Sequence, residues 1–166
     1  MSLRFARIYS ELGKSLFTSS NPRAKLTMNI YSEIYTVQKS DLDFLGHVNN
    51  KSYLDWMEKL AWAHAVSVGI DKPLQKKLNR ILAIYEHQMR YLASSYEGDR
   101  IELKTWVGKR IGCCQRERFF EFVRLNDNKT VFEANSIYVC ITLDSHRPKK
   151  IPREFIEPYF QNRAER

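Results

Sequence analysis

The strongest pattern in the chain is helical and covers Asn50–Gly69. Apolar side chains recur there every three or four residues, the spacing that places them along one side of a helix. Other apolar residues fill most of the positions between them, and a helix that is apolar on nearly every side is typically buried. Asn49 or Asn50 can cap its start, and Gly69 can end it. The pattern therefore predicts one buried helix about 30 Å long.

The other long segments alternate apolar and polar residues, as strands do. One of them, Thr27–Val37, precedes the helix. Four follow it: Arg80–Ala93, Arg100–Lys109, Cys113–Leu125 and Thr130–Leu143. We expect these four to pair in hairpin succession, and Asp71–Asn79 to be a polar connection between the helix and the first of them. In that first segment the alternation places one set of residues on the same side: Ile81, Ala83, Tyr85, His87, Met89 and Tyr91.

This order of elements predicts a single α+β domain. A sheet of about five antiparallel strands, with one long helix against a face, accounts for every long segment. A chain of 166 residues is long enough to bury a substantial core in this way. One sheet face cannot cover a helix that is apolar all round. We therefore expect further cover from a second subunit or from the N-terminal segment.

Residues 1–25 differ from the domain that we assign to residues 26–166. They are basic, and Glu11 is their only acid. Their loosely amphipathic pattern fits a peripheral helix docked on the domain, a membrane-surface contact or an organelle targeting segment. Three cysteines, an odd number without a C-x-x-C motif, favour a reducing compartment. We expect a cytoplasmic protein, with a mitochondrial location as the alternative.

The net charge of +8 favours partners that carry phosphate groups. The basic residues are dispersed and match no nucleic-acid recognition motif, so we expect no nucleic-acid partner. Lys109, Arg110 and Arg116 belong to this dispersed set, for which a solvated basic face is the simpler interpretation and contact with a phosphorylated cofactor such as coenzyme A the alternative. No His and Cys residues stand at metal-ligand spacing, and no apolar run is long enough to span a bilayer.

Candidate chemistry lies in the stretch Asp41–Tyr53, just before and into the predicted helix. A carboxylate a few residues ahead of a helix start can act as a base or nucleophile. The first free N–H groups of the helix can then bind a developing oxyanion. The alternative is purely structural, because Asp and Asn are common in turns and helix caps. The spacing alone leaves both interpretations open.

The residues Asp41-Leu-Asp43-Phe-Leu-Gly46-His47-Val48-Asn49-Asn50, followed by Tyr53, resemble a known family. They are similar to the start of hotdog-fold acyl-CoA thioesterases of the 4-hydroxybenzoyl-CoA thioesterase type, and to the same stretch of hotdog acyl-carrier-protein thioesterases. Downstream, similarity continues through Met89-Arg-Tyr91, Glu97-Gly-Asp99, Asp144 to Pro148 and Ile151-Pro152. The resemblance implies a hotdog fold, in which the sheet wraps one central helix and two subunits pair to form each active site.

The resemblance also implies roles for individual residues. Asp43 would act on the thioester carbonyl of an acyl-CoA, as nucleophile or as base for a water molecule. The backbone N–H of Asn50 would bind the oxyanion, and His47 and Asn49 would assist. In the acyl-carrier-protein enzymes an asparagine accompanies the histidine, and Leu45 stands at its position here.

Substrate contacts are expected from Tyr53, Met89 and Tyr91. The expected assembly is a homodimer or a dimer of dimers, and the expected reaction needs no cofactor beyond the CoA moiety of the substrate. Glu58 and His64, on the helix, are expected to be structural. The alternative function is a non-catalytic module that binds acyl thioesters or lipids at a membrane surface through residues 1–25.

Overall fold

The computed structural model of the protein describes residues 29–160. The helix expected within residues 1–25 lies outside this range. Seven helices and strands follow one another in the described part: β1 (Tyr31–Thr36), α2 (Asn50–Ser67), α3 (Lys72–Leu78), β2 (Ile81–Tyr91), β3 (Arg100–Ile111), β4 (Gln115–Arg124) and β5 (Lys129–Ile141). Three short 3₁₀ turns cover Lys39–Asp41, Arg153–Phe155 and Glu157–Tyr159.

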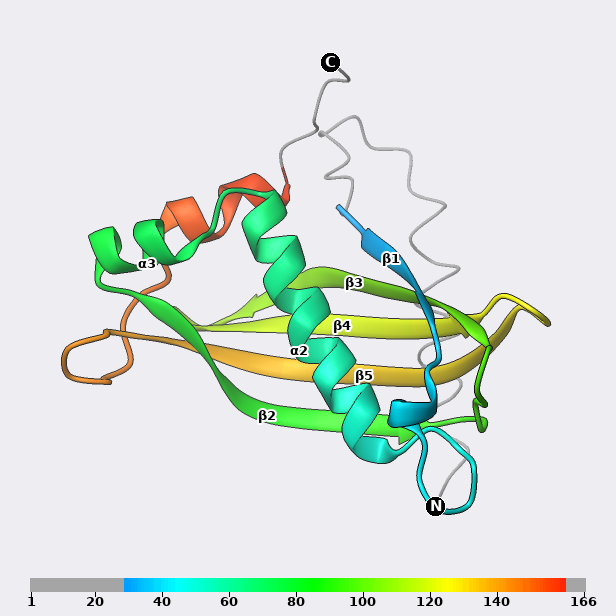
Figure 1. Ribbon diagram of the computed structural model, residues 1–166. Helices are drawn as coiled ribbons and strands as arrows, with labels where there is room; N and C mark the ends of the chain where they lie inside the picture. The colour runs from blue at the N-terminus through cyan, green and yellow to red at the C-terminus, as the bar shows by residue number, and fades with distance from the viewer. Residues whose placement is uncertain (1–28, 161–166) are drawn as a thin grey trace, which may run out of the picture.

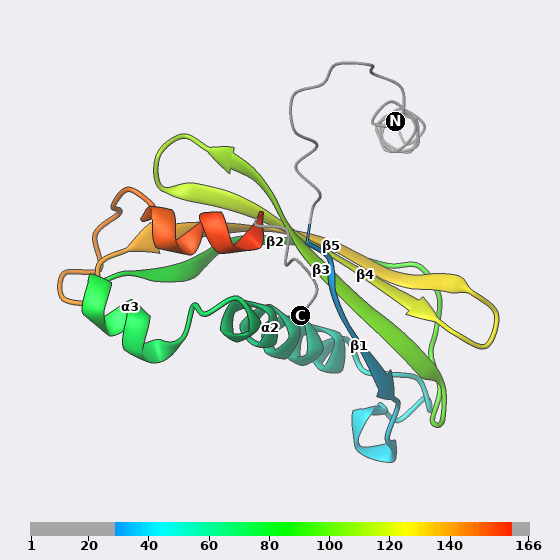
Figure 2. The same ribbon diagram turned by 90° about the horizontal axis from the view of Figure 1, so that it is seen from above.

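The five strands form one antiparallel sheet in the order β1-β3-β4-β5-β2. Helix α2 lies across one face of this sheet (Figure 1), and seen from above, the helix and the sheet form two layers (Figure 2). The predicted α+β architecture is thus confirmed. Among the described residues no helix is both long and apolar enough to cross a membrane.

The predicted hairpin succession is wrong for its first pair, because β2 does not pair with β3. Instead β2 pairs with β5 at the opposite edge of the sheet. The intervening corner, residues 92–99, is a crossing segment tied at both ends. Leu92 N donates to Val131 O at 2.8 Å, and Val37 N donates to Asp99 O at 2.9 Å. The segment is therefore not a tight turn: backbone hydrogen bonds fix one of its ends to β5 and the other to the end of β1.

Strand β2 also departs from simple alternation, because a bulge interrupts it. Its register with β5 shifts between Ile84 and Glu86, and Tyr85 is 65% exposed. On the helix side, Met89 lies opposite Ala134, as expected. Before the bulge, however, the residues on this side are Leu82 and Ile84, which lie opposite Cys140 and Tyr138. The prediction that Ile81, Ala83 and Tyr85 share the side of Met89 is therefore wrong. One extra residue moves the preceding side chains to the other face.

The segment expected to be a polar connection contains helix α3. Asp71 caps it, because its Oδ1 accepts a hydrogen bond from Leu74 N at 2.9 Å. Pro73 occupies its first turn, where a missing N–H costs nothing, and Asn79 ends it in the left-handed conformation with φ 52°. These cap signals were present in the sequence, but the segment is short and polar. It therefore lacks the apolar repeat that predicts a helix.

Helix α2 buries one face within the single chain. Its buried residues are Tyr53, Trp56, Met57, Leu60 and His64. The outer face carries Glu58 and Lys59, together with Trp62 and Val66, which are 40% and 45% exposed. The expectation of a helix buried all round is therefore wrong for one chain, and its cover by a second subunit stays a prediction.

Candidate functional site

Asp43 lies in a tight loop that presents its carboxylate just before α2. Leu42 and Val48 form a single antiparallel bridge that closes the loop, and Gly46 turns it with φ 79°. Asp43 N donates to His47 O at 2.8 Å. The Oδ1 atom of Asp43 accepts hydrogen bonds from Leu45 N at 2.9 Å and His47 N at 3.2 Å. Its Oδ2 atom accepts none from residues 29–160, so one carboxylate oxygen is fixed and the other remains available.

A cavity of about 340 Å³ opens beside this carboxylate. Its lining comes from the loop, the start of α2 and the segment after β2: Asp43, His47, Val48, Asn50, Tyr53, Tyr91, Leu92, Ala93 and Ser94. Five of the seven predicted site residues thus meet at one cavity. Asn49 and Met89 are not part of its wall.

The start of α2 borders the cavity through Asn50 and carries a free backbone donor. Asn49 is the N-cap, and its Oδ1 accepts a hydrogen bond from Lys51 N at 2.9 Å. The backbone N–H of Asn50, the first helical residue, has no hydrogen-bond partner within residues 29–160. A free N–H at a helix start carries partial positive charge and can receive an oxyanion.

The neighbouring acid, Asp41, has a structural role. Its Oδ2 accepts hydrogen bonds from Tyr35 Oη at 2.9 Å and from Gln38 N at 2.8 Å. These contacts hold the 3₁₀ turn to the end of β1, and Asp41 is not part of the cavity wall. The two acids, two residues apart, therefore differ in their contacts, and the predicted catalytic role of Asp43 stays a prediction.

Three aromatic rings line the cavity, those of His47, Tyr53 and Tyr91. Tyr53 and Tyr91 meet edge to face with centroids 5.4 Å apart, and Met89 Sδ lies 3.9 Å from the Tyr91 hydroxyl. Met89 therefore contacts Tyr91 without lining the cavity itself. The ring of His47 meets that of Tyr96 edge to face at 5.4 Å. Tyr91 is 43% exposed, so a bound molecule could cover it.

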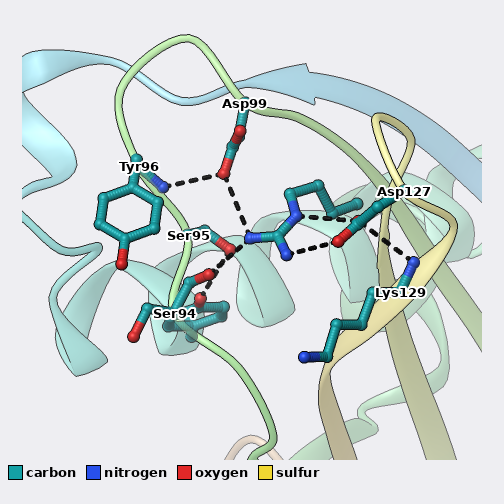
Figure 3. Close-up of polar contacts among 8 residues, drawn as sticks. Ser94, Ser95, Tyr96, Asp99, Asp127 and Lys129 are labelled. Atoms are coloured by element: carbon teal, nitrogen blue, oxygen red, sulfur yellow. Dashed lines mark hydrogen bonds and ion pairs between the residues drawn. The ribbon is translucent and has the colours of Figure 1, made fainter.

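Arg124, which sequence reasoning missed, anchors the far wall of the cavity. It donates to Ser94 O at 2.7 Å and makes two hydrogen bonds to the Asp127 carboxylate, at 2.9 and 2.7 Å. It also pairs with Asp99 at 3.6 Å, and Asp99 in turn accepts from Tyr96 N. Figure 3 shows the residues around this guanidinium: Ser94, Ser95, Tyr96, Asp99, Asp127 and Lys129. No local sequence signal links these segments, because the sheet brings them together.

The wall is tied to α2 as well. Tyr53 Oη donates to Ser95 Oγ at 3.2 Å, and Val48 N donates to Ser95 O at 2.9 Å. Ser95 is fully buried. The Asp43 loop, the helix start and the crossing segment thus form one hydrogen-bonded unit.

The remaining polar candidates lie elsewhere. His64 is completely buried, and burial, followed by the nearby positive charge of Arg118, lowers its pKa to about 3. It is a neutral structural histidine, as expected. Glu58 lines a separate cavity further along α2. Within the described residues no three His, Cys, Asp or Glu side chains are placed to hold a metal ion.

Comparison with known proteins identifies the family and the fold of the chain. The family model of the thioesterase-like superfamily matches residues 37–158. The fold is similar to that of a 1,4-dihydroxy-2-naphthoyl-CoA thioesterase from Synechocystis, with a TM-score of 0.70 and 14% identity, covering 78% of this chain and 95% of that protein. It is also similar to a hypothetical protein from Staphylococcus aureus in complex with CoA, with a TM-score of 0.73 and 15% identity. That match covers 82% of this chain and 85% of the other protein.

A third similar structure is the 12:0-ACP thioesterase from Umbellularia californica, with a TM-score of 0.71 and 18% identity. The match covers 80% of this chain and 51% of that protein, so the chain spans about half its length. Identities this low establish the fold alone, and that fold is the hotdog fold. Because the family model extends from the end of β1 to the C-terminal turns, the chain belongs to the thioesterase-like superfamily.

Proposed function

We propose that this protein hydrolyses an acyl-CoA thioester to the free acid and CoA. The observation that carries the proposal is one juxtaposition. A carboxylate with an available oxygen, Asp43 Oδ2, and an available helix-start donor, Asn50 N–H, border the same cavity. Acyl transfer needs this combination, because the thioester carbonyl must be attacked while its oxygen gains negative charge.

The geometry is compatible with two routes. In one, Asp43 Oδ2 attacks the carbonyl carbon and the C–S bond breaks; water then hydrolyses the acyl-enzyme anhydride. In the other, Asp43 takes a proton from a water molecule as that water attacks, and the thiolate leaves and is protonated. In both, the Asn50 N–H donates to the carbonyl oxygen. One such donor can lower the barrier by about 3 kcal/mol.

The other predicted residues are assigned supporting roles. The His47 ring borders the cavity, where it can hydrogen-bond the substrate or the water. Asn49 acts through the helix cap, which orients the Asn50 N–H. Tyr53 and Tyr91 contact the acyl group, and Met89 supports Tyr91.

We further propose a homodimer formed through β2. This edge strand has no neighbour on its outer side among residues 29–160, and an 11-residue unpaired edge is a site for pairing with another chain. Its exposed apolar residues are Ile84, Tyr85 and Tyr91, and Leu92, directly after the strand, is exposed as well. Antiparallel pairing of two copies would bring the Tyr91 end of one β2, beside the Asp43 cavity, next to the Ile81 end of the other.

The test is release of free thiol from a panel of acyl-CoAs that spans short, long and aromatic acyl groups, with acyl-carrier-protein thioesters alongside. Turnover of at least one CoA ester is expected. Turnover of carrier-protein esters alone would move the assignment to the class represented by the Umbellularia enzyme. Tight binding without hydrolysis, on liposomes or in solution, would favour the non-catalytic acyl-binding module instead.

A further inference from the structure

A second cavity, of about 380 Å³, lies beside the C-terminal half of α2. The start of β2, the middle of the sheet and the C-terminal turns enclose it. Its wall is mainly apolar and includes Ala61, Trp62, Ala65, Ile70, Val107 and Phe155. His64, which lies behind this wall, is about 21 Å along α2 from Asn50 at a rise of about 1.5 Å per residue. Within one chain the cavity is therefore separate from the one at Asp43, and its volume suits a small molecule.

The feature of this cavity that calls for a ligand is Arg118. It belongs to the cavity wall, yet it is only 6% exposed. Its Nη1 donates to His64 Nδ1 and to Thr105 Oγ1, both at 3.2 Å, and its Nη2 donates to Tyr159 Oη at 3.1 Å. These three acceptors are neutral. A guanidinium has five N–H donors, so two remain, and the Nε–H has no partner within residues 29–160.

The guanidinium of Arg118 lies 5.9 and 5.5 Å from the ring centroids of Tyr138 and Tyr159, but it has no carboxylate partner in residues 29–160. No ion pair joins it, or its neighbour Arg116, to a carboxylate in the described part of the chain. Arg116 also lines the cavity, with its guanidinium 4.8 Å from the Phe160 ring and a buried Nε without a partner. Glu58 and Glu117 contribute to the wall but pair with neither arginine. Buried arginines are normally matched by an anion.

We propose that this cavity binds an apolar carboxylic acid, with its carboxylate on Arg118 and Arg116 and its hydrocarbon part against Trp62, Ile70 and Phe155. A carboxylate matches the fork of a guanidinium, and the mainly apolar wall strengthens the interaction. The carboxylate can belong to a free fatty acid or to the far end of an acyl chain that is a thioester at its other end. Binding here does not depend on the proposed hydrolysis.

The test compares binding of dodecanoate and 1-dodecanol by calorimetry. The wild-type protein is expected to bind dodecanoate at least about tenfold more tightly, because only the acid can engage the guanidinium. Arg118→Met is expected to abolish this preference. Arg116→Met, on the less buried arginine, is expected to reduce the preference for dodecanoate severalfold. This variant replaces Arg118→Met in the test if Arg118→Met does not fold. Arg90→Met, on the exposed side of β2, is the matched control and should leave the preference intact.

Equal binding of acid and alcohol by the wild type would overturn the proposal. So would a preference that survives in the folded Arg118→Met or Arg116→Met variant. The two sources of the carboxylate are separated by displacement of dodecanoate from the Asp43→Asn protein. If dodecanedioyl-CoA displaces it at least about tenfold better than dodecanoyl-CoA, the carboxylate arrives on an acyl chain. If neither ester displaces it, the free acid is the ligand.

Discussion

At the scale of single residues, hydrogen bonding distinguishes side chains that are chemically alike. The Oδ2 atom of Asp41 accepts hydrogen bonds from Tyr35 and Gln38 that hold a turn in place, whereas Asp43 keeps Oδ2 available at a cavity. His64 and His47 differ in the same way. The first is buried against Arg118, and the second borders the cavity. The residue type alone identifies candidates for a chemical role, and the contacts in the fold distinguish a structural residue from one at the cavity.

The buried His64 predicts a dependence of stability on pH. Its pKa of about 3 lies below the ordinary value of 6.5, so the unfolded chain binds a proton more readily than the folded protein does. This contribution to stability is fully present above pH 6.5 and declines as the pH falls towards 3. Between pH 7.5 and pH 5.0, the free energy of unfolding should fall by about 2 kcal/mol more in the wild type than in His64→Gln.

Urea unfolding of the two proteins at both pH values measures this difference. Glutamine keeps an oxygen that can accept from Arg118 but does not titrate. His87, whose pKa is also lowered by burial, is present in both proteins and cancels in the comparison. Equal pH dependence in the two proteins would contradict the assignment of His64 as a buried neutral group.

Arg124 is predicted to be a positioning residue for the cavity wall. Its side chain is 15% exposed and joins Ser94, Asp99 and Asp127. Arg124→Met should lower the free energy of unfolding by about 2 kcal/mol, because hydrogen bonds to charged groups are lost. It should also lower kcat/KM for the best acyl-CoA. Arg90→Met, at a more exposed ion pair, should change stability by less than about 1 kcal/mol. An Arg124 variant as active as the control would contradict this role.

At the scale of secondary structure, the start of α2 combines stability with chemistry. Asn49 caps the helix and the next residue, Asn50, lines the cavity, so a change at the cap affects both. Asn49→Ala is predicted to lower the free energy of unfolding by about 1 kcal/mol. Asn49→Asp, which can still cap, should retain wild-type stability.

The same pair of variants separates two roles for Asn49. If it acts through the cap, activity will be lower in Asn49→Ala and near normal in Asn49→Asp, in parallel with thermal stability. Loss of kcat in both variants with unchanged stability would show direct participation of the amide in the reaction instead.

The elements that the sequence predicted well are those with a local cause. The long helix has a strong apolar repeat and an Asn cap, and strands β3 and β4 alternate buried and partly buried residues over most of their length. The bulge at Tyr85 has no such signal, because it is defined against β5. The edge position of β2 likewise depends on long-range bonds from the 92–99 segment. Asp43 and Asn50 could be found by spacing before a helix, whereas Arg124 and Arg118 act through segments distant in sequence.

At the scale of the whole molecule, the sheet has two different edges. One is the short β1, and the other is the long, bulged β2 with exposed aromatic residues. We predict that the 19.7 kDa chain forms a dimer of about 39 kDa, twice that mass, as measured by light scattering. Tyr85→Asp should weaken the dimer at least about tenfold and lower activity with it.

The matched control for the dimer is Ile34→Asp on β1. Ile34 is 58% exposed on the opposite edge, close to the 65% of Tyr85. The Ile34→Asp substitution should leave the mass of the dimer unchanged. A monomeric wild-type protein, or dissociation caused equally by both substitutions, would contradict pairing through β2.

The central claim is that the carboxylate of Asp43 carries the chemistry, and one kinetic comparison tests it most directly. Thiol release from the best acyl-CoA is measured for the wild type, Asp43→Asn and Asp55→Asn. Asp55 is an exposed acid on α2, paired with Lys59 at 2.6 Å, and its substitution should leave kcat near the wild-type value. We predict a fall in kcat of about 10²-fold or more for Asp43→Asn, with an unchanged melting temperature. Full turnover by folded Asp43→Asn would contradict the account.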